Sequence, residues 1–184
     1  MGRPRKFSRE GVLQKALPVF WKYGFAHTTL ADLEAATGVN KSGLYSEFEG
    51  KEELFLACLR YYLATRSAGA ILSSEPPGWN NIRKFLEEAA SCALDRRGCF
   101  AVNSMRELPG LPPEARKVIG AGRAKLKRLL KTNIAAENPK MDVDVVGDLV
   151  SVFFSGICIE ANMSADRSRV RERIESFMQI LRAA

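Results

Sequence analysis

The chain of 184 residues contains one histidine, His27, and four cysteines, Cys58, Cys92, Cys99 and Cys158. A single histidine excludes metal sites built from clustered histidines, and catalysis by a nucleophile–histidine pair could depend only on His27. The cysteines are widely spaced and form no C-x-x-C pair, so we expect thiols in a reducing compartment. Carboxylate pairs, activated-serine motifs and phosphate-binding loops are also missing. The sequence therefore predicts no enzyme, no cofactor and no metal site.

Long apolar runs are missing as well. The chain is polar up to Val12, unlike a secretory signal peptide, and the longest uncharged run, near 149–159, is too short to cross a bilayer. These two absences favour a cytoplasmic protein. What the chain has in excess is positive charge, because 28 Lys and Arg outnumber 21 Asp and Glu and give a formal net charge of +7. Such a surface suits a polyanionic partner.

Apolar residues repeat at intervals of three and four along the whole chain, and no segment alternates with period two for long enough to favour a sheet. The run 73–78, which contains two prolines and a glycine, is the clearest break. We predict an all-α fold with a small N-terminal unit over 1–50 and a larger helical body over 51–184. Helices are expected over 8–23, 30–36, 41–47, from Lys51 through Tyr62, and over 81–96, 100–108, 113–136, 143–163 and 167–182.

The second and third expected helices have capping residues that define a tight turn between them. Thr29 and Asp32 form a capping box, Gly38 fits the left-handed position after a helix, and Asn40 can cap the next one. A short turn with a glycine between two helices is typical of a helix-turn-helix. Val39 is expected to pack inward and to fix the crossing of the two helices.

The third expected helix turns Lys41, Ser42, Gly43 and Tyr45 away from its apolar side. One cation, small residues and an aromatic hydroxyl make a surface that could enter a major groove. The alternative is a shortened surface helix on which Tyr45 only covers the edge of the core.

Two further groups of residues could contact a phosphate backbone. Thr28, Thr29 and Lys51 lie at helix N-termini, where amide groups and the helix dipole favour an anion. A basic arm next to this unit could enter a minor groove, lie along phosphates or be a solvated tail. The cations of the arm are Arg3, Arg5 and Lys6.

The stretch GFAHTTL at 24–30, followed by DLEAATGV at 32–39, is similar to the TetR/AcrR family of bacterial transcriptional regulators. So are KSGLY at 41–45 with Phe48, and KEELF at 51–55. The similarity covers about residues 8–60 and includes many positions in one order. It implies a homodimeric, all-helical repressor with a three-helix DNA-binding domain and a ligand-sensing body.

The resemblance also implies roles for individual residues. The phosphates would be touched by Thr28, Thr29, Tyr45 and Lys51, and the bases by Lys41, Ser42 and Gly43. Glu47 departs from the family, which often has histidine or tyrosine at this position. Because an acid cannot donate to phosphate, Glu47 either accepts from a cytosine amine or pairs with Lys51.

The helix expected over 143–163 is apolar on more than one side, so it must be buried on two faces. A ridge of small residues on it, together with the apolar stripe of the last helix, predicts half of a four-helix bundle across a two-fold axis. The alternative is the core of a monomer. The residues predicted for the dimer interface are Gly147, Ser151, Phe154, Ser155, Ile174, Phe177 and Leu181.

An effector pocket is expected in the body, where aromatic and flexible apolar side chains accompany a few polar ones. Most of its candidate residues could equally be plain core: Phe85, Cys99, Phe100, Asn103, Met105, Arg106 and Phe153. Cys99 follows Arg96 and Arg97 at a helix start, which favours the thiolate and therefore redox or electrophile sensing. The alternative for Cys99 is a buried residue that packs the helix start.

Together these features predict a sequence-specific repressor that a small-molecule effector releases from a palindromic operator by shifting the spacing of two DNA-binding heads. Control by covalent or redox modification of Cys99 is the alternative within this class. A non-specific structural DNA-binding protein is the alternative from another class, and it would bind every duplex with similar affinity.

Overall fold

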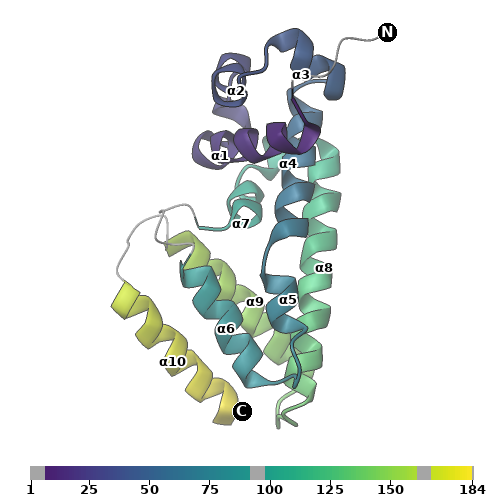
Figure 1. Ribbon diagram of the computed structural model, residues 1–184. Helices are drawn as coiled ribbons and strands as arrows, with labels where there is room; N and C mark the ends of the chain where they lie inside the picture. Colours follow the sequence, from purple (N-terminus) through teal and green to yellow (C-terminus); the bar gives the residue numbers. More distant parts are fainter. Residues whose placement is uncertain (1–6, 92–97, 161–166, 184) are drawn as a thin grey trace. The chain divides into compact units, whose positions relative to one another are not determined.

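The computed structural model describes residues 7–91, 98–160 and 167–183, and these residues form helices without a strand (Figure 1). This confirms the predicted all-α fold. No helix in this described part is long and apolar enough to span a membrane. In chain order the helices are α1 (Arg9–His27), α2 (Leu30–Thr37), α3 (Lys41–Glu47), α4 (Lys51–Thr65), α5 (Ala68–Leu72), α6 (Trp79–Ser91), α7 (Phe100–Met105), the 3-10 helix Leu108–Gly110, α8 (Pro113–Ala135), α9 (Val143–Glu160) and α10 (Arg167–Ala183).

The helices differ from the sequence prediction mainly in three places. Helix α1 does not end at Gly24 but continues to His27, with Gly24 as a non-helical residue inside it (φ 74°, ψ 174°). A separate α5 follows α4. Helix α7 is shorter than expected: it ends at Met105, and a turn at 106–107 leads into the 3-10 helix Leu108–Gly110. The expected helix ends at 96 and 163 lie outside the described residues.

By residue contacts the chain divides into two units. The first contains the chain up to Thr65 together with Asn103–Ile119, and the second contains Arg66–Val102 and the chain from Gly120 onward. The first unit therefore includes α1 to α4 and a segment that comes much later in the sequence. The predicted boundary at residue 50 separates α4 from the helices against which it packs, since α1 and α4 are in contact.

Aromatic packing holds the first unit together. Phe20 and Phe25 of α1 both contact the ring of Phe55 in α4, at centroid distances of 5.3 Å and 5.1 Å. Leu44 and Phe48, in and just after α3, are fully buried. Helices as short as α2 and α3 cannot be stable on their own, so this packing is what keeps them folded.

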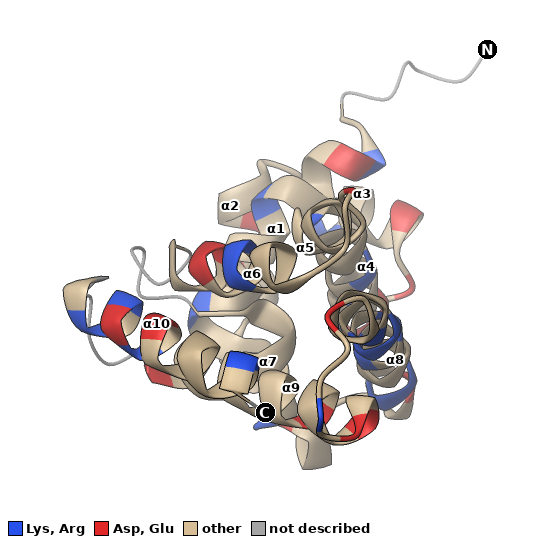
Figure 2. Ribbon diagram, turned by 90° about the horizontal axis from the view of Figure 1, so that it is seen from below, with Lys and Arg blue, Asp and Glu red and all other residues tan. Residues whose placement is uncertain are grey.

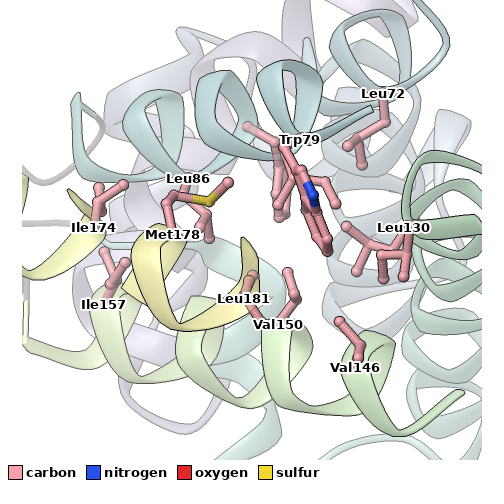
Figure 3. Packing of buried hydrophobic residues seen from close by; sticks show 13 residues of the cluster. Leu72, Trp79, Leu86, Leu130, Val146, Val150, Ile157, Ile174, Met178 and Leu181 are labelled. Carbon is pink, nitrogen blue, oxygen red and sulfur yellow. The ribbon is translucent and has the colours of Figure 1, made fainter. Parts of the chain in front are cut away.

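The core of the second unit is formed by α6, α9 and α10 with the later part of α8. Figure 3 shows Trp79 of α6 and Leu130 of α8 above Val146 and Val150 of α9. Ile174 and Leu181 of α10 are 1% and 2% exposed in this same cluster. Both residues, which the sequence predicts for the dimer interface, pack in the core of their own chain.

Other residues predicted for the interface also have partners within the chain. The ring of Phe154 lies 4.8 Å from Phe85, and Phe153 stacks on Phe177 with centroids 3.9 Å apart. Gly147 is buried within its own chain. The hydroxyls of Ser151 and Ser155 donate to carbonyl oxygens one turn earlier in α9, at 2.8 Å and 2.9 Å.

A buried amide fixes the loop between α5 and α6. Asn133 of α8 is fully buried, and its Nδ2 donates to the carbonyl oxygens of Leu72 and Leu129 at 2.7 Å and 2.8 Å. Its Oδ1 accepts from the amide of Gly78 at 2.9 Å and from Nδ2 of Asn81 at 3.0 Å. All four hydrogen-bonding positions of this side chain are therefore satisfied without water.

Basic side chains gather along α8 (Figure 2), and some of them pair with α9. Nζ of Lys127 lies 2.8 Å from the Asp148 carboxylate, and Lys131 pairs with Asp144. The hydrogen bond that Lys127 donates to Asp148 raises the pKa of Lys127, and the bond that Asp144 accepts from Lys131 lowers the pKa of Asp144. Both pairs are exposed to solvent.

Candidate nucleic-acid interface

Helix α2 begins with the predicted capping box. The Thr29 side chain accepts from the amide of Asp32, and the Asp32 carboxylate accepts from the amide of Thr29 at 2.9 Å. The hydrogen bond from the Thr29 side chain, followed by that from its amide, lowers the pKa of Asp32. Helix α2 ends at Gly38, whose φ of 71° is the left-handed conformation predicted for it. The local sequence signals for this helix are confirmed.

Helix α3 is capped by side chains on both sides of the turn. Oδ1 of Asn40 accepts from the amide of Gly43 at 2.9 Å, as predicted, and the Glu34 carboxylate of α2 accepts from the amide of Lys41. Lys41, Ser42 and Tyr45 are exposed. These three side chains form the outward face of α3. Lys41 Nζ lies 5.7 Å from the centroid of the Tyr45 ring.

Gly43 was predicted to belong to this face, and its position is more confined. A Cβ atom at Gly43 would lie 2.6 Å from Cγ1 of Val39 and 3.2 Å from Cε1 of Phe7. The missing side chain therefore makes room for the inward-packed Val39 of the turn. A contact between Gly43 and a base stays a prediction, but the structure already gives this glycine a packing role.

The C-terminal end of α3 is held by Arg9, which the sequence reasoning missed. Its guanidinium lies 4.2 Å from the ring centroid of Phe48, donates to the carbonyl oxygen of Glu47, and donates to Glu53 Oε1 at 3.1 Å. The other oxygen of Glu53 accepts from the amide of Glu49, and this bond is the main cause of the lowered pKa of Glu53. Arg9 and Glu53 are 44 residues apart, so no local pattern could join them.

Thr28 and Lys51 lie at the corner between α1 and α2. Thr28 is 1% exposed, and its hydroxyl donates to the carbonyl oxygen of Gly24 at 2.6 Å. Nζ of Lys51 donates to the carbonyl oxygens of Phe25 and Thr28 at 2.9 Å and 3.0 Å, and lies 4.5 Å from the Phe25 ring centroid. The structure thus gives both residues intramolecular roles. Their contacts with phosphate stay predictions, as does that of the exposed Thr29.

The predicted basic arm and the candidate pocket residues lie away from the outward face of α3 in the sequence. Arg3, Arg5 and Lys6 of the basic arm lie outside the described residues, as do Arg96 and Arg97 beside Cys99. The candidate pocket residues divide between the units. Phe85, Cys99, Phe100 and Phe153 belong to the second, whereas Asn103, Met105 and Arg106 belong to the first. Phe85 and Phe100 are fully buried, and Cys99 is half-buried.

The fold and the outward face of α3 define a helix-turn-helix protein with an additional helical unit. Residues 12–58 match the family model of the bacterial regulatory proteins of the tetR family. The repressor ComR of Escherichia coli is 28% identical over 97% of this chain and 88% of its own length, and the E. coli repressor BdcR is 26% identical over 87% and 82%.

Solved structures agree with the sequence comparison. A cysteine mutant of the TetR family transcriptional regulator CifR, complexed with 26-base-pair operator DNA, has a TM-score of 0.82 and 25% identity over 97% of this chain and 98% of its own. A TetR regulator from Chloroflexus aurantiacus has a TM-score of 0.83 and 25% identity over 94% and 93%. The segment 12–58 thus matches the tetR family, and the named relatives and solved structures are transcription regulators. The resemblance found in the sequence is confirmed.

Replacing Gly43 by alanine tests the packing beneath α3. Within a helix this change normally stabilises by about 0.5–1 kcal/mol, but here the new methyl group would overlap Val39. We expect the free energy of unfolding, measured by urea denaturation, to fall by about 1–2 kcal/mol.

Gly120→Ala is the matched control, because Gly120 lies in α8 with no atom within 4 Å of the Cβ position. It should raise the free energy of unfolding by about 0.5–1 kcal/mol. Stabilisation of similar size by both substitutions would contradict the close approach at Gly43.

Proposed function

We propose that the chain is a repressor that binds a palindromic DNA operator as a homodimer and is released by a small molecule bound in its second unit. The observation that carries this proposal is the outward face of α3, a seven-residue helix capped by Asn40 and Glu34 and held at its other end by Arg9. Side-chain caps at both ends leave the face exposed in a defined orientation. Sequence readout in a major groove requires such a defined orientation.

The chemistry of the face fits DNA. The Lys41 ammonium can donate to guanine O6 and N7, the Ser42 hydroxyl can donate or accept, and the Tyr45 hydroxyl can donate to a phosphate oxygen. ComR and BdcR are named repressors, and the CifR structure contains operator DNA. These relatives support the assignment of DNA as the partner and repression as the outcome.

A footprint on the promoter beside the protein's own gene tests the proposal. We expect two protected half-sites about 10 base pairs apart, centre to centre. Tyr45→Phe should weaken binding about tenfold to a hundredfold, because a hydrogen bond to a charged group contributes about 1.5–3 kcal/mol, and should leave the thermal unfolding midpoint unchanged.

Tyr23→Phe is the matched control, since Tyr23 and Tyr45 are both 46% exposed and Lys22 lies 4.7 Å from the Tyr23 ring centroid. Its affinity should equal that of the wild type. Equal losses in the two variants, or no protected site with the wild type, would argue against the outward face of α3 as the DNA-reading surface.

Dimerisation is the second part of the proposal, and its surface differs from the one first predicted. Helix α9 exposes Val145, Leu149, Val152 and Ile159 along one side, and α10 exposes Ile180. The spacing of four, three and seven residues places the α9 side chains on one face. A second copy of this chain is the occupant that we assign to this face, because two α3 helices must be held one DNA turn apart to read a palindrome.

Val152→Asp tests this surface, because Val152 is 69% exposed and folding should not depend on it. Sedimentation should give twice 20.4 kDa for the wild type and 20.4 kDa for the variant, since the interface would have to bury an unpaired carboxylate. Tyr23→Asp, an equally charged change in the first unit, should leave the dimer intact. A wild-type monomer at micromolar concentration would contradict the assignment.

Control through Cys99 is the alternative to a small-molecule effector. Among the cysteines that the structure describes, Cys58 and Cys158 are buried and Cys99 is partly exposed. Burial raises the pKa of the Cys58 thiol far above its usual range, which makes it unreactive.

Treatment with iodoacetamide at neutral pH separates the two forms of control. If Cys99 is the sensor, its alkylation, located by mass spectrometry, should release the promoter DNA, whereas a Cys99→Ser variant should bind DNA and ignore the reagent. If the protein still gives the full footprint after Cys99 is alkylated, control through Cys99 is excluded and control by a small-molecule effector is favoured.

A further inference from the structure

Glu107 contacts the DNA-binding helices although it lies far outside the segment 12–58 that matches the family model. Its Oε2 accepts from the amide of Phe25 at 3.0 Å and from the amide of Ala26 at 3.4 Å. Both amides follow the interruption of α1 at Gly24. Amides that begin a new helical turn have no acceptor within that turn and need one from elsewhere. The Glu107 carboxylate supplies it.

Gly24 makes this contact possible. A Cβ atom at Gly24 would lie 2.5 Å from Oε1 of Glu107, closer than any real contact, so only a residue without a side chain admits the carboxylate. The φ of 74° at Gly24 turns the next amides toward it. The break in α1 and the approach of Glu107 are therefore two parts of one arrangement.

A cation holds the carbonyl side of the same segment. Lys51 donates to the carbonyl oxygens of Phe25 and Thr28, while Glu107 accepts from the amides of Phe25 and Ala26. At the corner between α1 and α2, the Glu107 carboxylate therefore binds the backbone amides and the Lys51 ammonium binds the backbone carbonyls. Such charge-assisted hydrogen bonds are stronger than neutral ones. Thr29, the N-cap of α2, follows directly.

Glu107 also has a particular place along the chain. The segment Asn103–Ile119 belongs to the first unit, but the chain enters it from the second unit at Val102 and returns to the second unit at Gly120. Helix α7 begins with Phe100, a buried residue of the second unit, and Glu107 follows two residues after this helix ends. A change in the second unit near Phe100 therefore has a short covalent path to the corner.

We propose that Glu107 is a positioning residue that fixes the α1–α2 corner for DNA binding, and that structural changes in the second unit reach the DNA-binding helices through it. This inference rests on the proposed function. Withdrawal of the carboxylate leaves the Phe25 and Ala26 amides without their acceptor, the corner loosens, and α2 and α3 lose their fixed placement.

Amide hydrogen exchange in the full-length chain tests the contact itself. In Glu107→Ala the Phe25 and Ala26 amides should exchange at least tenfold faster than in the wild type. Glu107→Gln, which keeps an acceptor oxygen, should give an intermediate rate. Glu114→Gln is the matched control, because Glu114 lies in the same segment and pairs with Lys117 of its own helix. Unchanged exchange in Glu107→Ala would overturn the proposal.

Operator affinity, measured where circular dichroism shows every variant fully folded, tests the positioning role. Glu107→Ala should bind the footprinted duplex about tenfold more weakly, Glu107→Gln should recover part of the loss, and Glu114→Gln should match the wild type. Faster exchange with unchanged affinity would overturn the positioning role. A wild-type protein that binds no duplex selectively would overturn the proposed function and this role with it, while the exchange data would still report on the contact.

A change in the second unit tests the coupling. Phe100→Leu should speed exchange at Phe25 and Ala26 in the wild-type background and add nothing in the Glu107→Ala background. Leu181→Ala, a change in the core of the second unit at the far end of the sequence, should leave these amides unchanged. Equal effects of Phe100→Leu in both backgrounds would overturn the coupling and leave Glu107 as a local cap.

Discussion

Short helices leave more polar groups at their ends than they satisfy internally, and the DNA-binding unit depends on how those groups are held. Helix α3 has seven residues, so nearly all of its amides and carbonyls belong to one end or the other. Asn40 and Glu34 accept from its first turn, and Arg9 donates to its last. The corner before α2 is held in the same way by Glu107 and Lys51. A rigid recognition surface on such small elements follows from these contacts.

The second unit uses a different principle. Among the described residues of this unit, Asn133 and Asn81 are the buried polar side chains, and this amide pair fixes the loop before α6. The apolar surface of α9 continues beyond what the chain itself covers, with Val145, Leu149 and Val152 exposed. A folded chain rarely leaves a continuous apolar face in water, which is why we assign a second copy to it. Polar contacts thus fix the helix ends of the first unit, which aromatic packing keeps folded, and apolar packing orders the second unit.

Local features were predictable from sequence because they depend on residues within one or two turns. The capping box at Thr29, the left-handed Gly38 and the cap at Asn40 are of this kind. Arg9 with Glu53 and Glu107 with Phe25 were not, since these pairs join residues 44 and 82 apart. The stripe of α10 identified apolar residues correctly, but periodicity alone cannot say whether such a stripe meets its own chain or another. Ile174 and Leu181 meet their own chain.

The central claim is that the outward face of α3 reads a DNA sequence. Its most direct test is an equilibrium titration of the full-length protein, at physiological salt, against its footprinted duplex and a shuffled duplex of the same length and composition. We expect the protein to bind the footprinted duplex at least about a thousandfold more tightly than the shuffled duplex. Similar affinities for the two duplexes would contradict it and would indicate a protein that binds DNA through backbone charge alone.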